Sequence, residues 1–214
     1  QIGMGHFGKV LADGNIATTF DNQMEVGADV HFLSTKDVKK EYSWDSSQSL
    51  ANIGAYLNGV GEKGKFNINA DYGLNDYNYY GIYALQPSSN IDLQQKTNQF
   101  RINGFYDFYE NEILDDARVM TNFLKDHFDA NENYGALELN LAKHEIELPK
   151  LEGINMNADL GLELETLDTK FSLLDKNASN YFNLSAEPKL TFFKDKSYLM
   201  IGSEVAYLNE KTSS

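Results

Sequence analysis

Apolar and polar residues alternate one by one along several long segments of this chain. The clearest segments are 66–74, 154–164 and 182–192, in which every second residue is apolar, with a proline at position 188. A period of two places these sets on opposite faces of a β-strand, whereas a helix would mix them. Pro188 cannot donate a hydrogen bond to a neighbouring strand, so we expect a bulge or a frayed pair there.

Shorter alternating segments extend this pattern over the rest of the chain and give about twelve strands. They cover residues 26–32, 53–57, 100–108, 135–141 and 199–207. Turn residues at 21–22, 61–64 and 194–196 and longer polar stretches at 34–49 and 86–97 separate the strands, which predicts sequential antiparallel hairpins. We expect one β-region over residues 1–214, with a single helical turn at 113–117.

The length of the strands favours a membrane barrel over a soluble sheet. Soluble strands typically have five or six residues, whereas transmembrane barrels use about ten alternating residues that face lipid and lumen in turn. From Phe182 to Phe192 the chain spans about 33 Å, which a tilt near 40° reduces to about 25 Å along the membrane normal. The prediction is an all-β, antiparallel up-and-down transmembrane β-barrel. The alternative is a soluble all-β protein with one solvated face.

Composition narrows the possible partners. The net charge of −14 and pI near 4.6 argue against a protein that binds nucleic acid through phosphates. Aromatic residues make up 13% of the chain, which suits strands. The absence of cysteine excludes disulfides and thiolate chemistry, and the longest apolar runs are far shorter than the roughly 20 residues of a membrane helix.

Motifs that would carry catalytic or cofactor chemistry are incomplete. The glycines at 3, 5 and 8 match a dinucleotide-binding spacing but lack the strand before and the helix after it. Residues 129–140 begin like a calcium loop, but Tyr134 and Asn140 occupy the glycine and glutamate positions. The four histidines are scattered, and no nucleophile elbow is present. We therefore expect no enzyme activity, catalytic residue, cofactor or metal site.

Aromatic residues in the polar stretches are candidates for contact with a ligand or a partner. Tyr42 and Trp44 lie in a charged segment, where loop residues carry recognition. Tyr79 and Tyr80 belong to the densest tyrosine group in the chain. The competing interpretation is that these side chains are interfacial anchors or an aromatic girdle.

Several segments together resemble a known family. The glycine-rich start at residues 3–8, the strand at 26–34 with its serine-rich continuation, and the strand at 67–73 running into 79–83 resemble the barrel strands of TonB-dependent receptor-like outer-membrane proteins. The resemblance implies a barrel of twenty-two strands, closed around an N-terminal plug, that imports scarce nutrients with energy from the inner membrane. This chain has no plug-like segment, about half the strands and a polar end, so we expect part of a larger barrel. The alternative is a complete barrel of twelve strands.

These observations predict a protein of the Gram-negative outer membrane that takes up or passes a solute. The expected partners are outer-membrane lipid, an unidentified solute and other outer-membrane or surface proteins, with no nucleic acid. The alternative function is that of a secreted or surface-exposed soluble all-β module that binds a glycan or a protein.

Overall fold

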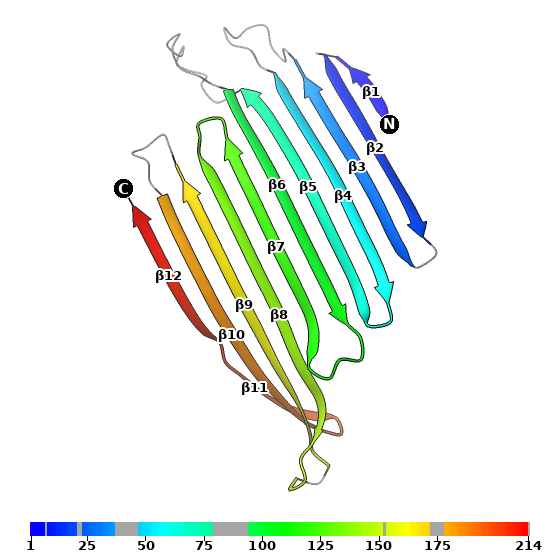
Figure 1. Ribbon diagram of the computed structural model, residues 1–214, viewed down its shortest axis with the longest axis vertical. Coiled ribbons are helices and arrows are strands. Elements are labelled where there is room, and N and C mark those ends of the chain that lie inside the picture. The colour runs from blue at the N-terminus through cyan, green and yellow to red at the C-terminus, as the bar shows by residue number, and fades with distance from the viewer. Residues whose placement is uncertain are drawn as a thin grey trace.

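The protein forms one antiparallel sheet of twelve strands, in which β1 to β11 lie side by side in sequence order and β12 pairs with β10 (Figure 1). The computed structural model describes residues 1–6, 8–20, 23–36, 47–78, 94–151, 153–171 and 178–213. The strands are β1 (Ile2–Gly5), β2 (Lys9–Phe20), β3 (Met24–Thr35), β4 (Gln48–Gly61), β5 (Gly64–Asn78), β6 (Gln94–Phe108), β7 (Leu114–Asp126), β8 (Asn131–Glu147), β9 (Asn155–Lys170), β10 (Ala178–Lys194), β11 (Ser197–Gly202) and β12 (Val205–Ser213). The predicted all-β, up-and-down architecture is confirmed.

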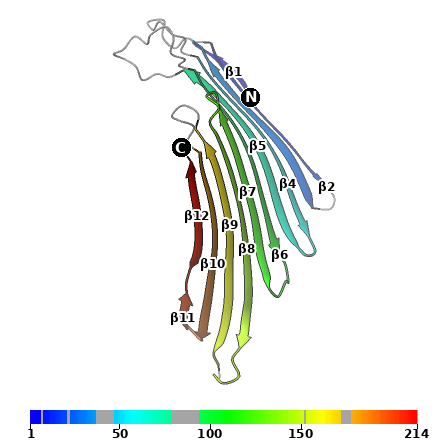
Figure 2. The ribbon, with the colours of Figure 1, turned by 60° about the vertical axis from the view of Figure 1, so that its left-hand side comes forward.

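The sheet is a single curved layer (Figure 2). Every contact between strands in the described part of the chain is between hydrogen-bonded neighbours, so no second layer covers either face. The sheet is open, with β1 and β2 at one edge and β11 and β12 at the other. Among the described residues no helix is long and apolar enough to cross a membrane.

The two faces of the sheet differ in composition because the alternation stays in phase from strand to strand. The apolar face carries Ile68 of β5, which is opposite Leu57 of β4, and Leu162 of β9, which is opposite Ala186 of β10. We call the opposite side, which carries Glu163 and the other residues of that parity, the polar face. Exposed residues of the apolar face include Ile16, Val30, Ile53, Ile68, Val119, Leu137, Leu184, Leu190, Leu199, Ile201 and Val205.

Burial is the reverse of that in a soluble protein. On β8, Leu137 of the apolar face is 50% exposed, whereas its neighbour Ala136 on the polar face is 4% exposed. On β10, Leu184 is 46% exposed and Ser185 is 4% exposed. Among the described residues Ala136 is the one buried apolar side chain, so the sheet by itself has no hydrophobic core.

Pro188 interrupts the pairing of β10, as the sequence predicts. On the side away from β9, β11 pairs with Lys189–Lys194 and β12 pairs with Ala178–Ala186. The break between β11 and β12 lies opposite Pro188, whose carbonyl accepts a hydrogen bond from the Ser203 amide at 3.1 Å. The N and O atoms of one strand residue point to the same side, so the missing donor of Pro188 faces this break. The predicted strand over 199–207 is therefore two strands.

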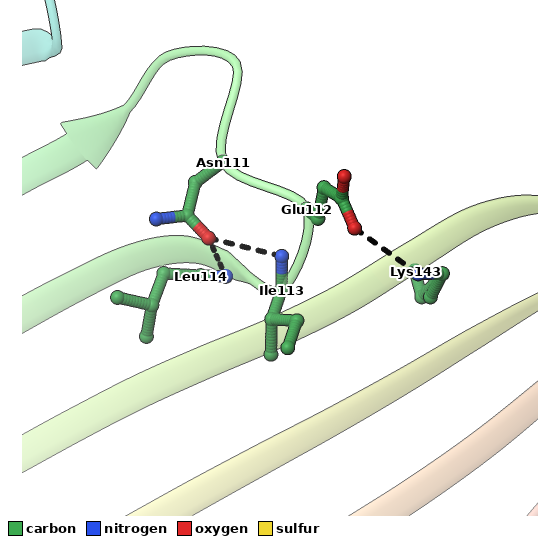
Figure 3. Close-up of polar contacts among 5 residues, drawn as sticks. All are labelled: Asn111, Glu112, Ile113, Leu114 and Lys143. Carbon is green, nitrogen blue, oxygen red and sulfur yellow. Dashed lines mark hydrogen bonds and ion pairs between the residues drawn. The ribbon is translucent and has the colours of Figure 1, made fainter.

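The helical turn predicted at 113–117 is wrong. The Asn111 side chain accepts hydrogen bonds from the amides of Ile113 and Leu114 at 3.0 and 2.9 Å, which closes a turn without a helix (Figure 3). The Ile113 carbonyl then accepts a hydrogen bond from the Ala142 amide of β8. Pairing with β8 extends this segment as the start of β7, because sheet hydrogen bonds satisfy backbone groups that one isolated helical turn would leave free.

The β4–β5 hairpin supplies a test of the fold. A Cβ atom at Gly64 would lie 2.2 Å from the Asp107 carbonyl oxygen of β6, whereas one at Gly61 would meet nothing closer than 3.8 Å. We predict that Gly64→Ala lowers the free energy of unfolding by about 2 kcal/mol or more, because backbone must move to admit the methyl group. Gly61→Ala in the same turn is the matched control, and urea unfolding measures both. Equal midpoints for the two variants would contradict this hairpin geometry.

Candidate functional site

The polar face is hollowed and carries most of the polar side-chain contacts. One hollow, of about 550 Å³, lies where β7 to β11 adjoin and is lined by side chains such as Asp116, Asn140, Asp159, Glu187 and Lys189. A second hollow of about 170 Å³ adjoins it and shares Asn140 and Glu187. These hollows are the candidate site on the described part of the chain, because concave polar surfaces are where a solute gains the most contacts.

Carboxylates dominate this part of the polar face. Their positions on one face follow from the register, which aligns Glu138 with Glu163 and Glu163 with Ser185 across β8, β9 and β10. We define the acidic wall as Asp116, Glu138, Asp159, Glu163, Glu165 and Glu187. The cations Arg118 and Lys189 lie on the same face, so the wall keeps an excess of negative charge.

Glu165 is the most heavily hydrogen-bonded carboxylate of the acidic wall. The Tyr134 hydroxyl of β8 donates to Glu165 Oε1 at 2.9 Å, and the Tyr181 hydroxyl of β10 donates to Oε2. The Asn183 amide also donates to Oε2, at 3.2 Å. Three donors from two neighbouring strands hold this carboxylate in one orientation, and hydrogen bonds to a charged acceptor are stronger than those between neutral groups.

The hollow beside Asp116 and Asp159 is bordered by irregular pairing and by ion pairs. The register of β7 against β8 shifts between Leu114 and Asp116, and the break opposite Pro188 borders the same hollow. Asp159 at its floor accepts from Lys189 Nζ at 3.3 Å and lies 3.5 Å from His144 Nε2. Bulges bend a strand and re-aim its side chains, which explains why the sheet is hollow here.

A second polar group lies on β6 to β8. Arg118 Nη1 is 3.3 Å from Glu138 Oε2, and the Arg118 guanidinium lies 5.5 Å from the centre of the Phe105 ring. Another hollow, of about 330 Å³, is lined by Arg118, Phe105 and the amides Asn67 and Asn103. This arrangement offers a solute a planar cation, a ring face and amide groups beside the acidic wall.

The structure does not describe the aromatic residues that the sequence predicts as contacts. Tyr42, Trp44, Tyr79 and Tyr80 all lie outside the described residues. The glycines at 3 and 5 belong to edge strand β1, where no helix follows. Within the described ranges no group of three His, Asp or Glu side chains is placed to hold a metal ion.

Sequence reasoning missed the Glu165 cluster, although part of the signal was present. The period of two places Glu163 and Glu165 on one face, and it does the same for Asn183 and Ser185. The contact with Tyr134 depends on a pairing between β8 and β9 that aligns Glu165 with Ala136, two residues from the tyrosine. Registers between long strands are not encoded in the spacing of either strand alone.

Comparisons with models of protein families, with curated proteins and with solved structures found no match. Chemically, the described polar face presents oriented carboxylates, amides and phenols to water or to a polar solute, and its negative charge favours cations over anions at its surface.

The Glu165 cluster gives a stability prediction. Glu165→Ala leaves two tyrosine hydroxyls and one amide without their acceptor, so we expect a loss of about 2 to 4 kcal/mol in the free energy of unfolding. Glu187→Ala is the matched control, since Glu187 lies on the same face but is exposed. Urea titrations of the two variants measure the difference. Similar losses would show that the three donors contribute nothing beyond a carboxylate at the surface.

Proposed function

We propose that this sheet is part of the wall of an outer-membrane β-barrel of the TonB-dependent receptor-like kind, which takes up or passes a polar solute. The single observation that carries the proposal is the uncovered apolar face. In a soluble domain such a face is buried against another layer, because contiguous exposed apolar surface of this extent is unfavourable in water. Lipid supplies an apolar cover without a second protein layer.

The distribution of charge on the apolar face supports contact with lipid. Along the described strands the charged residues of this face lie near the strand ends, and the rows between them are apolar or uncharged. At one end they are Asp76, Lys96, Lys125, Asp168, Lys170 and Lys211, and at the other they are Lys143 and Lys194. A charge at hydrocarbon depth costs about 2–4 kcal/mol in a membrane barrel, whereas one near the interface costs little.

Aromatic residues flank this uncharged band on both sides. Near the first end are Phe32, Tyr72, Phe100, Phe123 and Phe182, and near the second are Phe20, Phe66, Tyr106, Phe108 and Phe192. Members of each group touch across or along strands: the rings of Phe100 and Phe123 stack at 6.4 Å between centroids, and those of Tyr106 and Phe108 lie 4.5 Å apart. Two such belts are typical of a membrane barrel.

The stagger of the strands matches the tilt of a barrel. Phe20 and Met24 are opposite each other where the β2–β3 hairpin closes. Followed from pair to pair across the sheet, this row of opposed residues ends at Ala186 on β10, eight strands further along. β10 runs eight residues beyond Ala186 before its own hairpin closes at Lys194. A stagger of one residue per strand corresponds to a strand tilt of about 35°, which is the lower limit for barrels. With this tilt the belts on β6 and β10 are about 22 to 27 Å apart along the membrane normal.

The two ends of the sheet differ in the length of their connections. At the end we call the turn end, the connections have two to seven residues, from 62–63 between β4 and β5 to 148–154 between β8 and β9. At the opposite, loop end, residues 36–47 and 79–93 join β3–β4 and β5–β6. Short turns on the periplasmic side and longer loops outside are the usual arrangement of these barrels, which supports an outward-facing loop end.

The polar face then lines the aqueous side of the barrel. Its amides, phenols and carboxylates suit a water-filled passage, which is where polar residues of a barrel wall are tolerated. The acidic wall favours neutral or cationic polar solutes over anionic ones. The implied location is the outer membrane of a Gram-negative bacterium.

Fractionation of the native source tests the membrane proposal. We expect the band that contains these residues in the outer-membrane fraction, with a gel mobility in detergent that changes on boiling, because a folded barrel stays compact until heated. An apparent mass well above 24.2 kDa would indicate a larger barrel. Recovery as a soluble protein without a mobility shift would overturn the proposal and support the soluble binding module.

Fluorescence quenching tests which face meets lipid. The chain has no cysteine, so Leu162→Cys and Glu163→Cys place one label each on opposite faces of β9 at the same depth. In vesicles we expect a lipid-borne quencher to quench the label at 162 and a water-soluble quencher to reach the one at 163. The adjacent pair Leu184→Cys and Ser185→Cys repeats the comparison on β10. Equal quenching of both labels by the lipid-borne reagent would refute a membrane-facing apolar side.

A further inference from the structure

Lysines gather on the apolar face at the loop end of the sheet. They are Lys96 of β6, Lys125 of β7, Lys170 of β9 and Lys211 of β12, and the last three are exposed. These lysines belong to the apolar face. Lys125 is opposite Asn98, and Lys170 is opposite Ala178. Both pairs lie in the row of the sheet that also contains Phe32 and Leu74. These side chains therefore point away from the polar face and its acidic wall.

The four lysines lie within about two residues of one level once the stagger of one residue per strand is taken into account. Lys125 and Lys170 share one row of the sheet, Lys96 lies two residues nearer the loop end, and Lys211 lies two residues nearer the turn end. This displacement follows the same direction as the stagger of the hairpins. In Figure 1 the loop ends of β7, β9 and β12 descend in order toward the C-terminal edge, as this level requires.

We call these four lysines the lysine row. The charge around them is opposite in sign to the net charge of the whole chain. The protein has 18 basic and 32 acidic side chains, but the row has four lysines and two carboxylates, Asp76 and Asp168. Asp76 accepts hydrogen bonds from Gln94 at 3.0 and 3.1 Å. Lys125 lies 3.4 Å from Asp129, in a pair whose side chains are 64% and 83% exposed. Such exposed pairs contribute little, so this lysine remains available to another anion.

We propose that this row, Lys96, Lys125, Lys170 and Lys211, binds the phosphate groups of anionic lipid headgroups at the loop end of the sheet. The row lies just beyond the aromatic belt of Phe100 and Phe123, which is the depth of headgroups when the apolar face meets lipid. Lysine reaches headgroup phosphates from a flexible stem, and juxtamembrane lysines are attracted to anionic surfaces. This inference rests on the proposed membrane location and adds the chemistry of the lipid.

The test compares two kinds of vesicle. The native protein that contains these residues is folded into phosphatidylcholine vesicles and into vesicles in which about one third of the lipid is phosphatidylglycerol. Its urea unfolding is followed by the heat-modifiable gel form. We expect the ratio of folded to unfolded wild type to rise about tenfold or more with phosphatidylglycerol. The combined variant Lys96→Gln, Lys125→Gln, Lys170→Gln and Lys211→Gln should lose most of this gain. High salt should reduce the gain in the wild type by screening.

A polar-face variant with the same change in charge is the control. It replaces Lys9, Lys65, Arg101 and Lys189 by glutamine. It should keep the full response to phosphatidylglycerol, because any change in its stability affects both kinds of vesicle equally and cancels when they are compared. An equal response in the row variant would overturn the inference. So would stabilisation by free inorganic phosphate in phosphatidylcholine vesicles, which would assign the row to a soluble anion. If the wild type forms no folded, heat-modifiable species in either vesicle, the membrane proposal fails and this inference with it.

Discussion

The structure depends on one constraint, which is that a single β-layer with an apolar face must find an apolar environment for it. Alternation in phase over twelve strands produces such a face and leaves Ala136 as the one buried apolar side chain among the described residues. Hydrogen bonds between neighbouring strands satisfy the backbone N–H and C=O groups, but they do not cover apolar side chains such as Leu137 and Leu184. The proposal of a membrane location follows from this deficit, since the uncharged band and its aromatic borders match the dimensions of a bilayer.

The polar face solves a different problem, which is to keep many carboxylates close together. Glu165 is stabilised by donors from the strands on both sides, and Asp159 by Lys189 and His144. Unpaired carboxylates at such spacing would repel one another, so water or a polar solute must complete their solvation. A hydrated polar face and an apolar face without a protein cover are therefore two consequences of the same alternation.

Departures from regular pairing gather near the turn end of β7 to β12. The register shifts of β7 and β8 and the break opposite Pro188 occur there. Each shift adds residues on one strand and bends it, which increases local curvature and opens the hollow beside Asp116 and Asp159. The regular part of the sheet from β3 to β6 has fewer such features and carries the Asn-rich hollow beside Phe105 instead.

The sequence by itself determined the local elements of this protein. The period of two in 66–74, 154–164 and 182–192 predicted strands and their faces, because side-chain direction in a strand depends only on parity. The glycines at 61 and 64 predicted a hairpin for the same local reason, and Pro188 predicted an interruption because it lacks an N–H. The helical turn at 113–117 was mistaken, since the partner that makes this segment a strand is β8, about thirty residues away in the chain.

Only the tertiary structure decided the relations between strands. The register, the one-residue stagger and the single open layer arise from pairing between strands, which the alternation within one strand does not specify. The Glu165 cluster and the lysine row are examples, because each collects residues from strands that are separated in sequence. The aromatic residues Tyr42, Trp44, Tyr79 and Tyr80 lie outside the described residues. The alternation within a strand determines the face of the sheet on which each side chain lies, and the pairing of the strands determines which side chains it contacts.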